Sequence, residues 1–472
     1  MDYFDMRLGQ RRLGRIGPVL ALMLAMSIVA VSTGCSTVRP WINQPLNAGS
    51  SFDTAEIAQR DSSALVAVTL SGGGARAAAF SYGVLQELRA TGCCWNDRST
   101  NLLDAVDLIS GVSGGSIVAA YYAAFGAAGL DSFEQDFLRQ DFQQGLLSQI
   151  TRPGNLYDLT SPWFGRSQLL ERRLATLYRG TTFGDIARRP RHPQLVVTAT
   201  DMALGTGFDF TAEQFKLICS DIGSVPLSFA VTASSAVPLL LSPVTVRNYS
   251  GDCPAAAQDQ PQTSFAEDYR SRLLRAQQRT YLDATARPYI HLVDGGLSDN
   301  LGVRRLLDRA LSSGAMGATF NEVRIQPGSI KRLVLVVVNA ERDPAQRIDE
   351  SDRVPSTAAV VDALLFGTGN HATDETQGFL TDVAKRWQDD LREGRRDRFA
   401  GFASDAEIFL ITVNLRDAPA GEDRRMLLQV PTAFTIRDSE VTQLIDAGRQ
   451  VLRASPEYRS LRKSLGLMEA SP

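Results

Sequence analysis

A sharp turn around a serine is the feature that most constrains how this chain can fold. Residues 111–115 read Gly-Val-Ser-Gly-Gly, with an apolar stretch before them and a helix-forming stretch after them. A G-x-S-x-G sequence in that setting is typical of a nucleophile elbow, in which a strand turns directly into a helix with the serine at its apex. A side chain at Gly111 or Gly115 would collide with the neighbouring strand and helix. We therefore predict that Ser113 is a nucleophile at the end of a buried strand.

A second apolar stretch, Leu65–Leu70, leads into three consecutive glycines and an arginine. Negative charge grows on a carbonyl oxygen when a serine attacks an ester, and each preorganised donor aimed at that oxygen is worth about 3–4 kcal/mol. A glycine loop between a strand and a helix N-terminus exposes such backbone N–H groups. Arg76 either braces this loop or attracts a phosphate. We expect an oxyanion hole that comprises Gly72, Gly73, Gly74 and Arg76.

A third apolar stretch, residues 290–293, ends in Asp294-Gly295-Gly296. A carboxylate can serve as the base for a serine if it lies within about 3 Å of the hydroxyl oxygen. The glycines after Asp294 allow a tight turn and a close approach, so this residue is the favoured base. His291 lies three residues earlier and should point to the opposite face of the same strand. We interpret it as structural, and a triad that uses His291 or His371 remains the alternative.

Strand and helix patterns alternate from residue 63 onward, and several strands are apolar without interruption. Residues 333–338 read Leu-Val-Leu-Val-Val-Val, and residues 407–415 repeat the pattern. Uninterrupted apolar strands are typical of a parallel sheet covered on both faces. The pattern predicts an α/β sandwich. The expected strands are 65–70, 105–110, 195–199, 208–210, 332–339 and 407–415, with helices at 75–90, 116–125, 266–279 and 378–392.

The composition mainly excludes classes of function. The chain has 472 residues, 44% of them hydrophobic, and a net charge of −3 from 49 basic and 52 acidic residues. No global field draws it to nucleic acid. The length suits one large domain or two medium ones, and the oligomeric state is left open.

The N-terminus has the pattern of a targeting segment. Four arginines precede the apolar residues 18–31, a stretch too short for a comfortable membrane span, and Ser32-Thr33-Gly34-Cys35 follows. Small residues before a cysteine resemble the lipobox of bacterial lipoproteins, although Ser32 stands where leucine is usual. We expect Cys35 to carry a lipid anchor in a bacterial cell envelope, and Ser36 favours the outer membrane over the inner. A cleaved secretory signal, giving a periplasmic or secreted protein, and an uncleaved anchor are the alternatives.

Four further cysteines stand at Cys93, Cys94, Cys219 and Cys253. An exported protein can form disulfides, but sequence alone cannot choose among the three complete pairings. We expect Cys93 and Cys94 each to pair with Cys219 or Cys253, or to stay as thiols. Their spacing fits no zinc motif and histidines are few, so we expect no metal site and no cofactor.

The expected organisation follows from these patterns. Residues 1–34 are a signal peptide and residues 35–62 a polar tether. The catalytic domain covers residues 63–418, because residues 407–415 read as one more core strand, with polar insertions near 249–289 and 341–403. Residues 419–472 form a helical extension packed on the core.

The three turns together resemble the signature blocks of the patatin-like phospholipases. Gly72-Gly73-Gly74-Ala75-Arg76, Gly111-Val112-Ser113-Gly114-Gly115 and Asp294-Gly295-Gly296 occur in the family's order. Less specific blocks of the family also have similar counterparts here, at residues 198–201 with 205–207, residues 233–238 and residues 297–300. The resemblance implies a three-layer α/β/α sandwich with a mostly parallel central sheet.

It also implies an activity. Ser113 and Asp294 would form a Ser–Asp dyad, with the backbone of Gly72–Gly74 as the oxyanion hole. The chemistry would be hydrolysis of phospholipid or lysophospholipid esters through an acyl-serine, with membrane lipids as substrate and no metal. Two alternatives remain open: a non-lipid serine esterase with a histidine-containing triad, and a non-catalytic envelope lipoprotein that keeps the fold.

Overall fold

The structure is a computed structural model of the chain. It describes residues 39–47, 63–95, 98–189, 192–253, 269–304, 306–308, 328–343, 352–357, 360, 363, 368–393 and 402–467. The expected signal peptide, Cys35 and most of the tether lie outside the described residues.

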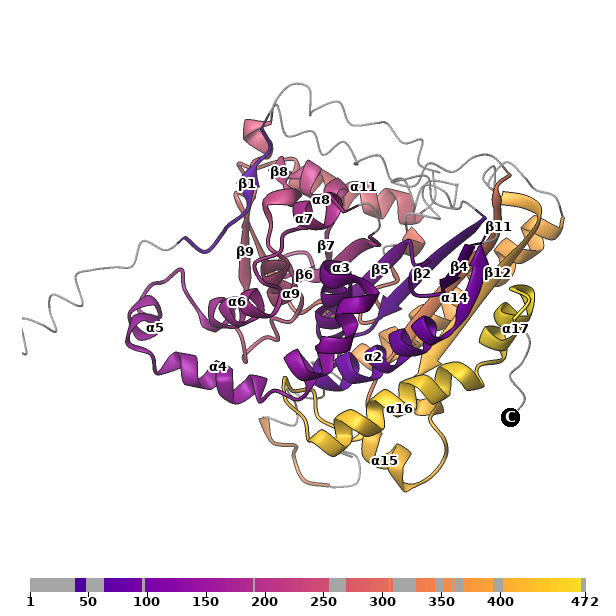
Figure 1. Cartoon of the computed structure of the whole chain (residues 1–472). Coiled ribbons are helices and arrows are strands. Elements are labelled where there is room, and N and C mark those ends of the chain that lie inside the picture. The colour runs from indigo at the N-terminus through magenta and orange to yellow at the C-terminus, as the bar shows by residue number, and fades with distance from the viewer. Residues whose placement is uncertain are drawn as a thin grey trace, which may run out of the picture.

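A mostly parallel sheet forms the centre of the molecule (Figure 1). In the described part of the chain it has eight strands, in the order β12-β11-β2-β5-β6-β10-β9, with β7 also paired to β6. Strands β12, β11, β2, β5 and β6 run parallel to one another. Strands β7 and β10 pair antiparallel with β6, and β9 pairs antiparallel with β10. Their bounds are β2 Ala64–Leu70, β5 Leu108–Val112, β6 Gln194–Asp201, β7 Thr206–Phe210, β9 Val244–Arg247, β10 Tyr289–Val293, β11 Ile330–Asn339 and β12 Phe402–Asn414.

Helices cover both faces of this sheet, as alternation along β2 demonstrates. Val66, Val68 and Leu70 belong to a core shared with helices α2, α3, α9 and α16, whereas Leu65 and Ala67 belong to a second core that includes Trp387 of α14. The predicted three-layer α/β/α sandwich is thereby confirmed. The helices are α2 Gly74–Ala90, α3 Gly114–Phe133, α4 Phe142–Ile150, α5 Pro153–Asp158, α6 Arg166–Leu177, α7 Phe183–Ala187, α8 Ala212–Leu217, α9 Leu227–Ser234, α11 Tyr269–Tyr281, α14 Thr368–Arg392, α15 Glu422–Leu428, α16 Asp438–Ala454 and α17 Pro456–Ser464.

Helix α16, the last but one of the described helices, lies directly along α2, which leads out of the glycine loop (Figure 1). A Cβ atom on Gly83 would sit 2.1 Å from the carbonyl oxygen of Ile445, and one on Gly448 would sit 2.3 Å from that of Phe80. The two helices therefore pack backbone against backbone, which requires glycine at both crossing points. The boundary at residue 418 between the catalytic domain and the C-terminal extension stays a prediction.

Several element bounds differ from the expected ones. Strand β5 begins at Leu108 rather than Ala105, because the side chain of Asp107 accepts a hydrogen bond from the N–H of Val66 and ends the preceding turn. Helix α3 continues to Phe133, past a non-helical residue at Gly126, and α14 begins ten residues earlier than the predicted Gly378.

Of the two outcomes expected for Cys93 and Cys94, pairing with Cys219 or Cys253 is wrong, and the thiol alternative stays a prediction. Cys219 and Cys253 form a disulfide with each other, with their Cα atoms 5.5 Å apart. The N–H of Tyr249 donates to the carbonyl of Ile218, and this contact brings the two segments together. Cys93 and Cys94 lie instead on the small hairpin of β3 (Gly92–Trp95) and β4 (Arg98–Asn101).

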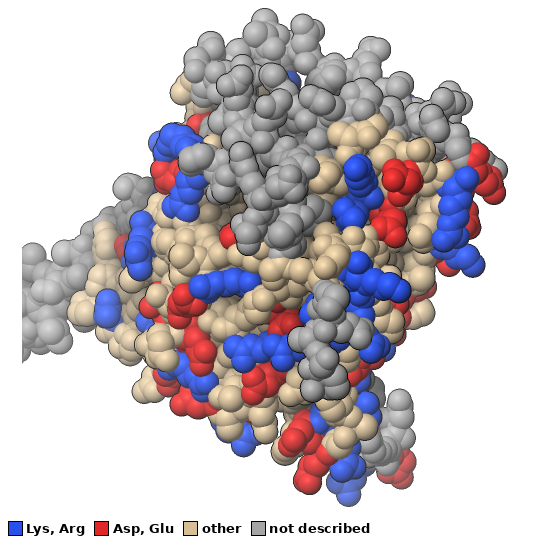
Figure 2. Space-filling model, turned by 45° about the vertical axis from the view of Figure 1, so that its right-hand side comes forward, with Lys and Arg blue, Asp and Glu red and all other residues tan. Residues whose placement is uncertain are grey.

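The described surface carries both signs of charge. Figure 2 shows lysine and arginine interspersed with aspartate and glutamate over the visible face. Among the described helices, none is long and apolar enough to cross a membrane. The described residues also include no cluster of histidine, cysteine and acidic side chains that could hold a metal ion.

Candidate active site

Ser113 lies between the end of β5 and the start of α3, with φ 47° and ψ −118°. A residue other than glycine rarely adopts a positive φ, so the turn is strained. Its glycines are sterically required: a Cβ on Gly111 would sit 2.5 Å from the Cα of Ser116, and one on Gly115 would sit 2.3 Å from the carbonyl oxygen of Leu70. The elbow that the sequence predicted is present.

Ser113 and Asp294 meet in the structure although 181 residues separate them. The Ser113 hydroxyl donates to Oδ2 of Asp294 at 2.8 Å, and Oδ1 of Asp294 accepts the N–H of Gly296 at 2.8 Å. The backbone of Asp294 is held by two hydrogen bonds. The N–H of Asp294 donates to the carbonyl of Ala236, and the hydroxyl of Thr200 donates to the carbonyl of Asp294. The carboxylate is thus fixed on both sides, within the distance that a general base needs.

Burial raises the pKa of Asp294 to about 6, while the hydrogen bonds from Gly296 and Ser113 act in the opposite direction. A carboxylate taken out of water favours its neutral form, and this makes it a stronger base than an exposed aspartate. The group is therefore ionised at neutral pH and still able to accept a proton from serine.

The glycine loop differs in one respect from the expected oxyanion hole. The N–H of Gly72 donates to the carbonyl of Asn300 at 3.1 Å, so this N–H is not available to bind an oxyanion. Gly73 has φ 139° and Gly74 has φ 61°, and within the described residues no acceptor takes either N–H. A Cβ on Gly114 would sit 2.1 Å from the carbonyl oxygen of Gly74, so the loop touches the elbow. The candidate donors narrow to Gly73 and Gly74.

Arg76 braces the loop. Its Nε donates to the carbonyl of Ala340 at 2.9 Å and its Nη1 to that of Val430 at 2.6 Å, with only 2% of the residue exposed. Burial lowers its pKa, and the nearby charge of Arg342 lowers it further. Of the two roles expected for Arg76, the structure supports the brace, because these contacts join α2 to the segments that follow β11 and precede α16.

Ser234, at the end of α9, is a residue whose role the sequence did not reveal. Its hydroxyl accepts the N–H of Ser113 at 2.8 Å and donates to the carbonyl of Thr198 at 2.6 Å. It thereby fixes the backbone of the nucleophile to β6. The small-residue block 233–238 was noticed as a pattern, but only the fold assigns this hydroxyl to the elbow.

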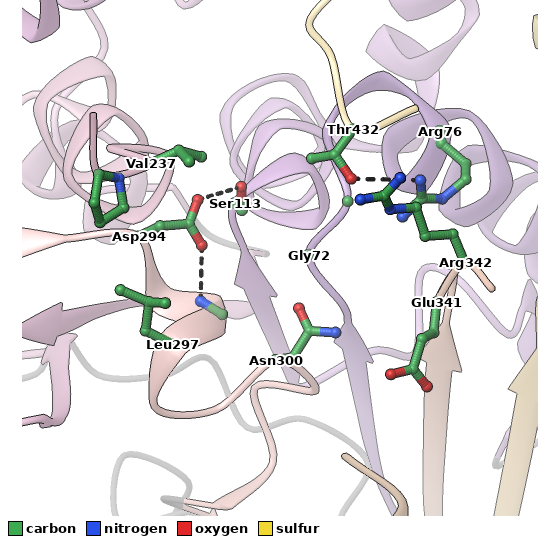
Figure 3. Close-up of a pocket in the computed structure, with 13 residues that line it drawn as sticks. Gly72, Arg76, Ser113, Val237, Asp294, Leu297, Asn300, Glu341, Arg342 and Thr432 are labelled. Atoms are coloured by element: carbon green, nitrogen blue, oxygen red, sulfur yellow. Dashed lines mark hydrogen bonds between the residues drawn. The ribbon is translucent and has the colours of Figure 1, made fainter. Parts of the chain in front are cut away.

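The pocket around the dyad has an apolar and a polar half (Figure 3). Val237 and Leu297 lie on the side of Asp294. Pro238, the next residue after Val237 in the chain, also lines the pocket. Asn300 and a group beyond Gly72 form the other side: Arg76, Glu341, Arg342 and Thr432. An ester that joins an apolar chain to a polar group fits this division.

Among the described residues that line the pocket there is no histidine. His291 is exposed on β10, where its Nδ1 lies 3.1 Å from the hydroxyl of Thr245. His371 is exposed on α14, with Nε2 3.4 Å from a carboxylate oxygen of Glu375. The nearest base to Ser113 is thus a carboxylate.

The elbow, the mostly parallel sheet and the buried, hydrogen-bonded pair of Ser113 and Asp294 are the arrangement that a serine hydrolase requires. The sequence profile described as patatin-like phospholipase matches residues 68–307, about half of the chain, so the chain belongs to the patatin-like phospholipase family. It is a lipid acyl hydrolase.

Solved structures with a similar arrangement include the human GIVD cytosolic phospholipase A2, at TM-score 0.42 and 11% identity over 92% of this chain and 69% of that chain. The same protein in complex with methyl gamma-linolenyl fluorophosphonate matches at TM-score 0.39 and 11% identity, over 87% of this chain and 60% of that chain. These similarities are low, so the family assignment depends on the sequence profile. Comparison with curated proteins gave no significant match.

Replacing Ser234 with alanine should lower kcat by at least about tenfold with little change in KM, because a buried N–H left without a partner costs about 1–3 kcal/mol and here belongs to the nucleophile. The matched control is Ser235→Ala, since the Ser235 hydroxyl is equally buried at the same helix end but has no hydrogen-bond partner among the residues that the structure describes. Steady-state kinetics on one ester substrate measures both variants. Equal activity of the two would show that Ser234 does not position Ser113.

Proposed function

We propose that the protein cleaves acyl ester bonds of phospholipids or lysophospholipids through a Ser113–Asp294 dyad and an acyl-serine intermediate. The observation that carries this proposal is the 2.8 Å hydrogen bond from the Ser113 hydroxyl to the buried carboxylate of Asp294. Serine is a weak nucleophile until a base removes its proton, and the pocket offers this carboxylate for that purpose.

In the acylation step, Asp294 takes the hydroxyl proton as Ser113 Oγ attacks the ester carbonyl carbon. The oxyanion that forms accepts hydrogen bonds from the N–H groups of Gly73 and Gly74. Protonated Asp294 then gives its proton to the leaving alkoxide oxygen as the carbon–oxygen bond breaks. The products are an alcohol, which for a phospholipid is a lysophospholipid, and acyl-Ser113.

In the deacylation step, a water molecule takes the place of the alcohol. Asp294 removes a proton from it as it attacks the acyl carbon, and the same two amides hold the second oxyanion. The bond to Ser113 Oγ breaks, Ser113 regains a proton from Asp294, and a fatty acid leaves. One carboxylate thus serves as base and acid in both steps.

The two halves of the pocket support a lipid substrate with a polar head. Val237, Pro238 and Leu297 offer apolar surface beside Asp294, where an acyl chain would lie. Arg342 and Thr432 lie beyond the glycine loop, where a phosphate or glycerol group would find donors. A histidine-dependent esterase is the weaker alternative, because both candidate histidines are exposed and neither lines the pocket.

A fluorophosphonate probe should label the wild-type protein on Ser113 and fail to label Ser113→Ala. On a panel of phospholipids and lysophospholipids read by mass spectrometry, Asp294→Asn should lower turnover by at least about 100-fold, the low end for a lost general base. His291→Ala and His371→Ala should keep the wild-type rate, with circular dichroism as the check on folding. Wild-type turnover in Asp294→Asn, together with loss in a histidine variant, would replace the dyad by a triad.

We also propose that Cys35 carries a lipid anchor, with the protein on the bacterial outer membrane. Support comes from the sequence around Cys35 and from the described start of the chain. Asn43 is 1% exposed and donates to the carbonyl of Arg247, while Trp41 packs on Tyr289 with ring centroids 5.1 Å apart. The chain is therefore fixed to the fold a few residues after Cys35. A lipid at that point would hold the enzyme beside an insoluble substrate.

Replacing Cys35 with alanine should release the protein from the membrane fraction while its activity on a soluble ester persists, because the catalytic residues are untouched. Fractionation with immunoblotting measures release, and mass spectrometry of the N-terminal peptide detects the acyl chains. A Cys35→Ala variant that stays membrane-bound would show that another segment is the anchor.

A further inference from the structure

Two leucines stand exposed directly beside the catalytic pocket. Leu239 is 68% exposed and Leu240 is 63% exposed, and they follow Val237 and Pro238, which line the apolar half of the pocket. Large exposed apolar side chains placed together next to a site mark a surface that contacts another apolar phase.

The backbone holds these leucines outward. Leu239 has φ 71°, a left-handed conformation that leucine rarely adopts. Nη2 of Arg166 donates to the Leu239 carbonyl at 2.8 Å, and the N–H of the buried Leu241 donates to the carbonyl of Val237 at 2.9 Å. The strained turn is thus tied down at both ends, so the exposure of the two leucines is built into the fold.

Two further exposed apolar side chains lie on segments that neighbour this turn or the pocket. Trp163, 48% exposed, lies just before α6, and this segment contacts the one that follows the leucines: the N–H of Ser167 donates to the hydroxyl of Ser242 at 3.2 Å. Leu297, 42% exposed, borders the pocket on the other side of Asp294 from Val237 (Figure 3).

We propose that Trp163, Leu239, Leu240 and Leu297 form a lipid-docking rim, which inserts into the acyl region of a lipid surface around the mouth of the pocket. The inference rests on the proposed function. A phospholipid ester lies just below the head groups, so the lipid must move only a short way to reach Ser113 if the apolar side of the mouth is itself immersed. Tryptophan at the edge of such a surface is favourable, since its ring is apolar and its N–H is polar.

The position of the described N-terminal residues is compatible with an orientation in which the docking rim faces the membrane. Arg247, at one end of the four-residue strand β9, receives the hydrogen bond from Asn43, while Ser242 lies just before the other end. β1 (Gln44–Pro45), β9 and α6 lie on the same side of the molecule in Figure 1. An anchor at Cys35 would be separated from Arg39 by at most about 14 Å of extended chain. The anchor and the rim can therefore reach one lipid surface.

The test uses the full chain and a double variant, Leu239→Asn with Leu240→Asn. Asparagine tolerates a positive φ better than leucine does, so the turn should keep its shape. The matched control is Leu273→Asn with Leu282→Asn, which removes two leucines that are 53% and 46% exposed at α11 and just after it. Each protein is assayed on phosphatidylcholine vesicles and on a short-chain ester below its aggregation concentration.

The rim variant should lose at least about tenfold in rate on vesicles, because two leucine side chains no longer leave water, and should keep its rate on the monomeric ester. The control pair should keep both rates. Lipids with bromine on their acyl chains should quench the fluorescence of Trp163 in the wild type, and comparison with Trp163→Phe identifies the emission of this residue. The quenching should disappear in the rim variant.

Two results would overturn the docking rim: an unchanged vesicle rate in the rim variant, or no quenching of Trp163 in the wild type. A failure of the proposed function looks different. In that case the wild type would hydrolyse no lipid of the panel, whereas the quenching measurement, which needs no turnover, would still decide whether the rim inserts.

Discussion

Direct contact between backbones at the ends of neighbouring strands is the constraint on which this site depends. A Cβ on Gly115 would sit 2.3 Å from the carbonyl oxygen of Leu70, and one on Gly295 would sit 2.1 Å from that of Thr198. No side chain fits at such distances. Glycine at these positions lets β2, β5, β6 and the end of β10 close around one point, and only then can a hydroxyl and a carboxylate 181 residues apart share a hydrogen bond.

The site also depends on chain beyond the part that matches the family profile. Residues 68–307 contain the dyad and the glycine loop. The loop, however, is held from outside this range: the N–H of Ala75 donates to the carbonyl of Ala433 at 2.7 Å, and Arg76 donates to Ala340 and Val430. Helix α16 then packs on α2. The C-terminal region therefore holds the glycine loop that carries the candidate oxyanion donors, although none of its described residues is a candidate reacting group.

The sequence could predict the parts of the site that local pattern determines. Gly111 and Gly115 around Ser113, and the glycines after Asp294, each require a particular backbone, and a parallel sheet brings strand ends to one edge. Roles that depend on a distant partner could not be predicted. The N–H of Gly72 is used because the carbonyl of Asn300 lies opposite it. The hydroxyl of Ser234 and the Cys219–Cys253 pairing likewise follow from tertiary contacts, not from spacing along the chain.

The pH dependence of kcat/KM on a soluble ester tests the central claim most directly. Asp294 must be ionised to act as a base, and burial raises its pKa to about 6. The mechanism predicts a plateau above about pH 7 and a tenfold fall per pH unit below about pH 6, with the protein still folded. Asp299 is the control, because burial also raises its pKa to about 6. The Asp299→Asn variant should show the same fall in kcat/KM at acidic pH as the wild type. A rate that stays flat from neutral pH to pH values well below 6 would contradict the assignment of Asp294 as the base.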